Sequence, residues 1–354
     1  MFLRLRAHNN WDRTIMKFLD TSRRKMLAVI SVASLGLAAL SSTSAAQDLI
    51  KIKVGDTTSL AQLGMYVGIQ KGIFKKHGLD VERIAMPGGA KVLTTLLTGD
   101  IDVAYLAAST ALQAQFQGRP VKIIGMSHSM EIYALLGRND LKGTVSKPED
   151  LKDRTIGISS IGSGSWAFAK YLAHLGKLDD TRDIKIVPLG NMSAIIAGLK
   201  TNRVDTVTLW EPGITMALAE NAGYSIIDLV DPAQHQKYMN AAESMVEVIL
   251  AKEDLITGQS EKMKKFFAAQ NEAFAYIHST PMEEIAKAVA PIVGESNMDV
   301  LVASLKRNLP GVPKIATVDE QVFNSTMKRM VETGLYKEAM PFAKSVDNRY
   351  GAVK

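Results

Sequence analysis

The 354-residue chain contains no cysteine. This absence excludes disulfide bonds, thiolate zinc sites, iron–sulfur clusters and cysteine nucleophiles, and it also excludes a lipid anchor on a cysteine. The six histidines show neither the H-E-x-x-H spacing nor the neighbouring carboxylates of a metal site. We therefore expect a protein without a metal, without another cofactor and without thiol chemistry.

Excess positive charge is scarce outside the N-terminus. The net charge is +6, but residues 1–46 hold seven Lys or Arg against two Asp, so the rest of the chain is almost neutral. A nearly neutral chain gives no electrostatic reason to expect a nucleic acid or an acidic membrane as partner. The composition, 47% hydrophobic and 22% charged, is that of a folded globular protein, and the length allows two domain-sized cores.

The apolar run at residues 26–40 follows the basic residues 23–25 and precedes the small residues 41–46. This order is typical of a cleaved export signal, and the run is too short for a comfortable membrane span. We expect residues 1–46 to be removed, leaving a soluble periplasmic protein without a lipid anchor or stable membrane insertion; a retained anchor is the alternative. The adjacent Arg23 and Arg24 fit twin-arginine export, and ordinary Sec export remains open.

Two stretches of the chain share one layout. Asp102 and Asp205 each open a short apolar strand after a polar turn, and they lie 103 residues apart. The same offset relates Asp80 to Asp183. A duplicated lobe is the simplest cause, and two similar lobes predict a ligand between them.

Alternating strand and helix patterns predict an α/β fold in which mostly parallel sheets are flanked by helices. The strand ends of such a sheet face one rim, where ligands bind. We expect residues 47–137 to form the first part of lobe 1, residues 138–243 to form lobe 2, and residues 244–354 to return to lobe 1 and pack C-terminal helices on it. The first crossing between lobes is expected in the loop at residues 138–150.

Several motifs of the chain occur in a recognisable order, beginning with residues 72–81, which have the pattern G-x-F-K-K-x-G-L-D-V. This pattern resembles the opening of the substrate-binding proteins of nitrate/sulfonate/taurine ABC importers. Each motif is weak alone, but their order and spacing over about residues 50–230 are specific. The further matches are residues 97–104, 117–122 and 149–157, then Val204 and Asp205, then Trp210, Glu211 and Pro212.

This resemblance implies a two-lobed periplasmic-binding fold of type II. Such a protein closes on a small ligand and presents the closed form to an ABC permease and its ATPase, and we expect a monomer. Closure requires no chemistry, because the ligand only shifts a hinge equilibrium by its preference for the closed state.

Two other functions remain open. The chain also resembles the thiamine-pyrimidine-synthase-like family, and relatives include desulfinases with a cysteine nucleophile. The missing cysteine excludes desulfinase chemistry and speaks against a synthase that relies on cysteine- and histidine-rich iron chemistry, but another hydrolase on this fold remains possible. A ligand-sensing partner of a membrane receptor is the second alternative.

The candidate ligand-binding residues follow predicted strands. The clearest signal is the Gly/Ser-rich loop at residues 159–165, where glycines allow close backbone approach and serines offer donors. No G-K-[ST] follows, so the loop is not a P-loop, and a simple helix cap is its alternative. The candidates are Thr57, Ser59, Gly88, Gly89, Ser109, Thr110, Ser160, Ser163, Gly164, Ser165, Asn191, Trp210 and Glu211.

The basic side chains near this rim limit the ligand class. Only Lys91 and His128 are expected there, so N–H and hydroxyl donors would hold an anion, which disfavours a tiny ion such as nitrate. An organic sulfonate or carboxylate fits better, with an apolar part near Trp210 or an amine near Glu211. For Glu211, bracing the hinge or pairing with an arginine is an alternative as strongly expected as contact with the ligand.

Overall fold

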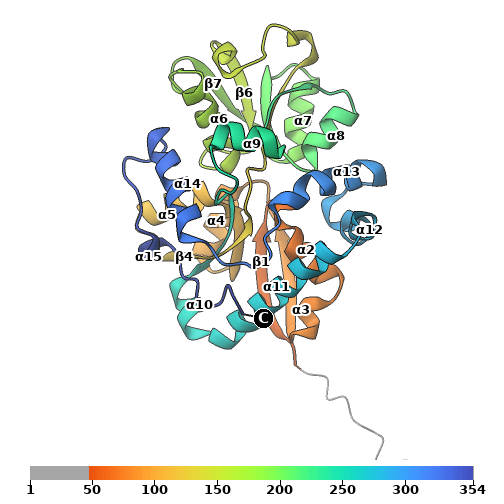
Figure 1. Cartoon of the computed structure of the whole chain (residues 1–354), viewed down its shortest axis with the longest axis vertical. Coiled ribbons are helices and arrows are strands. Elements are labelled where there is room, and N and C mark those ends of the chain that lie inside the picture. The colour runs from red at the N-terminus through yellow and green to blue at the C-terminus, as the bar shows by residue number, and fades with distance from the viewer. Residues whose placement is uncertain (1–47, 354) are drawn as a thin grey trace, which may run out of the picture. The chain divides into compact units, whose positions relative to one another are not determined.

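The computed structural model describes residues 48–353, so the predicted export signal lies outside the described residues. These residues form two five-stranded sheets flanked by helices (Figure 1). We call the half that holds the first sheet the first lobe and the half that holds the second sheet the second lobe. In Figure 1 the labels β1 and β6 mark the two halves.

The first sheet has the strand order β2-β1-β3-β10-β4. β1 runs parallel to β2 and β3, and β10 lies antiparallel between β3 and β4. In β1 the buried Ile52 and Val54 alternate with exposed lysines, as a strand with one solvent-facing side requires. The strands are β1 (Ile50–Asp56), β2 (Leu79–Ala85), β3 (Val103–Ala107), β4 (Val121–His128) and β10 (Glu247–Lys252).

The second sheet repeats this arrangement with the order β7-β6-β8-β5-β9. β6 is parallel to β7 and β8, and β5 lies antiparallel between β8 and β9. The strands are β5 (Tyr133–Gly137), β6 (Arg154–Ile158), β7 (Ile184–Pro188), β8 (Thr206–Trp210) and β9 (Tyr224–Asp228). In both sheets the antiparallel inner strand follows a segment of the other lobe, so the chain crosses between lobes twice.

The repeated aspartates have the same structural task in both lobes. Asp102 accepts a hydrogen bond from the Lys53 amide, and Asp205 accepts one from the Thr155 amide, each at 2.8 Å. Both carboxylates thus tie the start of one strand to its neighbour. The repeat detected in the sequence therefore corresponds to two equivalent lobes.

The first crossing differs from the sequence prediction. β5 pairs with β8, with Tyr133 opposite Trp210, so the chain has left the first sheet before residue 133 and not in the loop at 138–150. An apolar strand pattern does not tell which sheet the strand joins, which is why the boundary at residue 137 was placed too late. The second crossing lies between α9 (Pro232–Met239) and β10.

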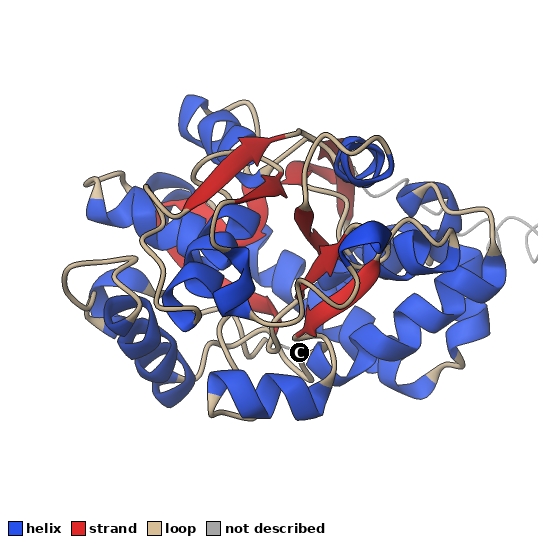
Figure 2. Ribbon diagram, turned by 90° about the horizontal axis from the view of Figure 1, so that it is seen from above, coloured by secondary structure: helices blue, strands red, loops and turns tan. Residues whose placement is uncertain are grey.

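The helices surround both sheets, as the view from above shows (Figure 2). The other helices are α2 (Leu63–Gln70), α3 (Ile73–Lys76), α4 (Gly89–Thr98), α5 (Ala108–Phe116), α6 (Gly164–Leu175), α7 (Met192–Lys200), α8 (Gly213–Ala219), α10 (Glu253–Gly258), α11 (Ser260–Ser279), α12 (Met282–Val293), α13 (Met298–Asn308), α14 (Glu320–Glu332) and α15 (Phe342–Ser345), with 3-10 turns η1 (Leu60–Gln62), η2 (Asn139–Leu141), η3 (Pro148–Leu151) and η4 (Leu309–Gly311).

The C-terminal helices pack on the first lobe, as predicted. α11, α12 and α13 share one hydrophobic core with α2 and β1, and within this core the rings of Phe74 and Phe266 stack at 5.5 Å. α4, α5 and α14 share a second core in this lobe. α13 also contacts α8 of the second lobe.

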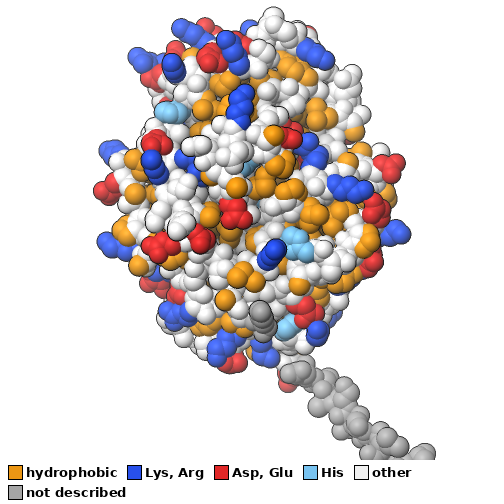
Figure 3. All heavy atoms as spheres, in the orientation of Figure 1, with side chains coloured by type: hydrophobic (Ala, Val, Ile, Leu, Met, Phe, Trp, Pro, Cys, Tyr) orange, Lys and Arg blue, Asp and Glu red, His pale blue; other side chains and the backbone are white. Residues whose placement is uncertain are grey.

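Within residues 48–353 no single helix has the length and hydropathy needed to cross a membrane; α12 and the segment 298–311 pass that test only when combined across a bend of 105°. On the face shown in Figure 3, Lys and Arg alternate with Asp and Glu instead of forming one positive patch. This mixture agrees with the charge distribution inferred from the sequence.

Candidate ligand-binding cleft

A polar cavity lies where the two lobes meet. It encloses about 320 Å³, part of it open to solvent, and both lobes contribute to its wall. We call it the polar cavity. Seven of the thirteen predicted residues line it: Thr57, Ser59, Gly88, Gly89, Ser163, Gly164 and Trp210.

The N-termini of two helices from different lobes meet at the polar cavity. Gly89 is the first residue of α4 and Gly164 is the first residue of α6, and both line the cavity. The first amide N–H groups of a helix have no intrahelical acceptor and carry the positive end of the helix dipole. Two such ends at one cavity favour an anionic group there.

Trp210 supplies a further donor. Its side chain ends β8 and is only 4% exposed, yet its Nε1 atom has no hydrogen-bond partner among residues 48–353. Tyr133 packs edge-on against the indole at 6.2 Å. A buried donor without a partner costs about 1–3 kcal/mol. Because Trp210 lines the polar cavity, its buried and unpaired N–H indicates that a ligand bound there can supply an acceptor atom.

Glycine is required at two points where the lobes touch. A Cβ atom on Gly164 would overlap the Tyr133 hydroxyl and would lie 2.6 Å from the Cβ atom of Ala107 in the first lobe. A Cβ atom on Gly88 would lie 2.9 Å from Oγ of Ser160 in the second lobe. The sequence predicted that glycines of the Gly/Ser-rich loop allow a close approach of the backbone. At Gly164 this approach is between the two lobes.

Three serine hydroxyls form a cluster at the start of α6. Ser159, Ser163 and Ser165 lie within 2.9–3.0 Å of one another. Ser163 also donates to the Ser160 carbonyl and accepts from the Trp166 amide, so it caps α6 as well as facing the polar cavity. Ser165 belongs to this cluster and does not line the polar cavity.

Glu247 is the one carboxylate in the wall of the polar cavity. It lies at the start of β10, and Gln62 Nε2 donates to its Oε1 at 2.6 Å. Gln62 in turn accepts from the Tyr66 hydroxyl at 2.7 Å. Burial raises the pKa of Glu247 to about 8, and the nearby Asp56 carboxylate adds to the rise. Glu247 can therefore donate a proton to an anion or, once charged, pair with an ammonium group.

The protonation of Glu247 predicts a pH-dependent stability. The unfolded carboxyl titrates near 4.5 and the folded one near 8, so the unfolded chain loses its proton first and stability falls as pH rises through that window. Within this window each unit of pH lowers the free energy of unfolding by up to about 1.4 kcal/mol. We expect Glu247→Gln to become more stable relative to wild type as pH rises from 5 to 8, measured by urea unfolding at each pH. The matched change of the exposed Glu243 should show no such trend, and a flat difference for Glu247→Gln would contradict this assignment.

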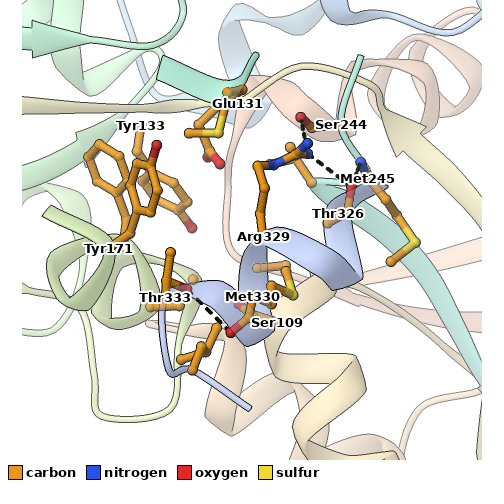
Figure 4. Close-up of a pocket in the computed structure, with 17 residues that line it drawn as sticks. Ser109, Glu131, Tyr133, Tyr171, Ser244, Met245, Thr326, Arg329, Met330 and Thr333 are labelled. Carbon is orange, nitrogen blue, oxygen red and sulfur yellow. Dashed lines mark hydrogen bonds between the residues drawn. The ribbon is translucent and has the colours of Figure 1, made fainter. Parts of the chain in front are cut away.

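A larger cavity adjoins the polar cavity and shares Ala107, Tyr133 and Gly164 with it. It encloses about 620 Å³, part of it open to solvent, and we call it the aromatic chamber. The rings of Tyr133, Phe168 and Tyr171 stack along its wall at 5.5 and 6.3 Å. Figure 4 shows these tyrosines on one side of the chamber, Arg329 on the other and Glu131 between them.

The remaining predicted residues do not line the polar cavity. Ser109 lines the aromatic chamber, and Thr110 donates from the first lobe to the Gly162 carbonyl of the second lobe at 3.0 Å. The hydroxyl of Ser160 is buried beside Gly88 without a partner among the described residues. Asn191 is exposed and caps α7 by accepting from the Ala194 amide, so it lies outside both cavities. It was predicted as a ligand residue because a cap and a ligand group look alike in sequence.

Glu211 takes the alternative that the sequence left open and pairs with an arginine. Its carboxylate is 2.7 Å from Nε of Arg307, which also binds Asp228 at 2.7 Å. Burial raises the pKa of Glu211 although Arg307 opposes the rise. Because α13 packs on the first lobe and both acids belong to the second, this ion pair joins the lobes and does not line either cavity.

The basic residues near the cleft also differ from the prediction. His128 is buried, and its ring nitrogens lie 2.8 and 3.1 Å from the carbonyls of Met130 and Asn308. Lys91 is exposed on α4. Arg329 instead enters from α14, a helix more than 100 residues downstream of Glu211, the last residue of the predicted rim, and no local motif indicates it.

Comparisons with known proteins show which proteins this chain is similar to. The profile of the family described as NMT1/THI5 like matches residues 60–284. The putative binding protein YtlA of Bacillus subtilis (strain 168) is 22% identical over 272 residues, which cover 76% of this chain and 78% of YtlA. The taurine-binding periplasmic protein of Escherichia coli (strain K12) is 26% identical over 144 residues, 40% of this chain and 42% of that protein.

The fold is similar to that of solved binding proteins. The alkanesulfonate-binding protein SsuA from Xanthomonas axonopodis pv. citri, solved with bound MOPS, superposes with a TM-score of 0.70 at 16% identity over 85% of this chain and 99% of SsuA. At this identity the match shows the fold alone, and it confirms the predicted two-lobed periplasmic-binding fold of type II. The family profile covers more than half of the chain, so this protein belongs to the NMT1/THI5-like family.

Proposed function

We propose that this protein is an exported solute-binding protein that captures a small organic anion or zwitterion between its lobes and delivers it to an ABC permease and its ATPase. The observation that carries the proposal is Trp210, which lines the polar cavity with the N-termini of α4 and α6 and whose buried N–H has no partner among residues 48–353. The names of the relatives, a putative binding protein and a taurine-binding protein, support it.

The polar cavity fits the two ends of a small zwitterion. The acidic group would accept from the Gly89 and Gly164 amides and from Trp210, and an ammonium group would pair with Glu247. A simple organic anion also fits, because protonated Glu247 becomes one more donor. Closure of the lobes on this solute would form the surface that the permease recognises, in the periplasm if residues 1–46 are the export signal.

Thermal unfolding with a panel of compounds tests the proposal. The panel contains taurine, alkane- and arylsulfonates, aromatic carboxylates, pyrimidines and nitrate. A ligand that binds only the folded state raises the melting temperature by mass action. We expect sulfonates, aminosulfonates or carboxylates to raise it and nitrate to leave it unchanged. Conversion of a bound compound into a product would instead favour an enzyme on this fold.

Trp210→Phe tests the donor in the cavity wall. The change keeps an aromatic ring but removes the N–H together with the five-membered ring of the indole. The lost hydrogen bond of about 1–1.5 kcal/mol alone should weaken the best compound of the panel about tenfold, as measured by isothermal titration. Trp166→Phe is the matched control, because Trp166 lies outside the polar cavity. Equal affinities of wild type and Trp210→Phe would remove Trp210 from the site.

A further inference from the structure

Arg329 is a half-buried cation without a carboxylate partner. Its guanidinium group donates to three hydroxyls, those of Ser244, Ser325 and Thr326, at 2.7–3.2 Å. Among residues 48–353 no carboxylate oxygen lies within salt-bridge distance of it. Neutral hydroxyls accept its hydrogen bonds but do not neutralise its charge. A partly buried cation without an opposite charge nearby lowers the stability of the fold, so the presence of Arg329 here requires a physical reason.

The surroundings of Arg329 screen its charge only weakly. The chamber wall contains the stacked rings of Tyr133, Phe168 and Tyr171, together with methionines, and such apolar surroundings screen charge less than water does. Burial lowers the pKa of Arg329, as expected for an uncompensated cation, although Glu131 opposes the effect from a distance. Glu131 lines the same chamber, and burial raises its pKa to about 7. Near neutral pH it therefore offers a proton as readily as a charge.

We propose that Arg329 binds a second acidic group of the ligand, so that the solute is an elongated molecule with an apolar, preferably aromatic body and an acid at each end. This inference rests on the proposed function, which places the first acidic group at the N-termini of α4 and α6. The proposal places one ligand across both cavities, which adjoin along Ala107, Tyr133 and Gly164. The stacked rings offer a flat surface to an aromatic body, and guanidinium binds carboxylate or sulfonate with two parallel hydrogen bonds.

The position of Arg329 links the second acid to closure. Arg329 extends from α14, which packs on the first lobe, whereas Tyr133, Phe168 and Tyr171 belong to the second lobe. Its partner Ser244 lies in the second crossing between the lobes. A ligand that reaches Arg329 therefore contacts both lobes and the crossing segment, and a ligand without the second acid leaves the cation uncompensated in the closed form.

Two aromatic probes that differ by one group test this proposal. Benzenesulfonate carries one acid, and 4-sulfobenzoate adds a carboxylate at the far end of the same ring. We expect wild type to bind 4-sulfobenzoate at least tenfold more tightly than benzenesulfonate in isothermal titration. In Arg329→Met this preference should disappear, because the variant can no longer pair with the added carboxylate. Lys328→Met, which removes an equal charge from an exposed neighbour, should keep the wild-type preference.

The outcomes separate the two proposals. If wild type binds benzenesulfonate and the added carboxylate brings no gain, the assignment of Arg329 is overturned and the proposed function stands. If wild type binds neither probe, the anion site at the helix N-termini is overturned as well.

A ligand-free measurement decides between ligand binding and a structural role for Arg329. If its charge is uncompensated, ligand-free Arg329→Met should melt at the wild-type temperature or above it. If Arg329 mainly holds Ser244, Ser325 and Thr326 together, the loss of these hydrogen bonds should lower the melting temperature by several degrees. The second result would overturn the proposal.

Discussion

Replacing Gly164 by alanine should weaken solute binding between about tenfold and 100-fold, because overpacking costs about 1–3 kcal/mol. The new methyl group would lie 2.6 Å from Cβ of Ala107, which belongs to the other lobe. Opening of the lobes relieves this contact, whereas the contact with the Tyr133 hydroxyl lies within the second lobe and persists, so only the part of the cost that comes from Ala107 falls on the closed, ligand-bound state. Titration with the best compound of the panel measures the loss, and small-angle scattering should show a more open protein at equal ligand concentration.

Gly258 provides the matched control for this change. It lies at the end of α10, and a Cβ atom there would meet nothing within 4 Å. Gly258→Ala should therefore bind as wild type does. If Gly164→Ala also bound as wild type does, the two lobes would not close on a ligand at this point, and the location of the site would be wrong.

Arg307→Met should destabilise the fold by about 3 kcal/mol, the lower end of the range for removing one partner of a buried ion pair. Glu211 and Asp228 are 2% and 6% exposed, and the change leaves both carboxylates without their cation. The lower end applies because the Arg307 side chain is one-third exposed, and solvent screens part of the interaction. Urea unfolding in the absence of ligand measures the effect.

The neighbouring ion pair on α13 is the control. Lys306 binds Glu283 at 2.8 Å, but both side chains are more than half exposed. Lys306→Met should cost less than about 1 kcal/mol, as exposed pairs usually do. If the two variants lost the same small amount of stability, the ion pair between Arg307 of α13 and the two acids of the second lobe would not stabilise the fold.

The fold was predictable from the sequence because its signals are local and repeated. The offset between Asp102 and Asp205 reflects two carboxylates with the same hydrogen bond to a neighbouring strand. The assignment of β5 was not predictable in the same way. An apolar segment of five residues has no feature that selects one sheet over the other, and only its pairing with β8 decides it.

Part of the wall of the polar cavity was predictable, where the chain supplies it from loops after strands. Gly88, Gly89, Ser163 and Gly164 carry a recognisable pattern, and the structure brings them together. Asn191 was selected by the same pattern, but it only caps a helix. Local sequence cannot separate these two roles, because both require a polar side chain before a helix.

The charged groups of the cleft were the hardest to predict. Glu247 begins a strand whose next four residues are apolar and buried, and a carboxylate at this position is a signal that could have been used. Arg329 gives no such signal, because it lies on an amphipathic C-terminal helix where arginine is common. Its importance depends on which residues surround it in the folded chain.

A crystal structure of the protein with the panel compound that stabilises it most is the most direct test of the central claim. The account predicts the unaltered compound between the lobes, with an acceptor atom at Nε1 of Trp210 and an acidic group at the amides of Gly89 and Gly164. A compound bound on the outer surface, or a chemically altered compound in the cleft, would contradict it.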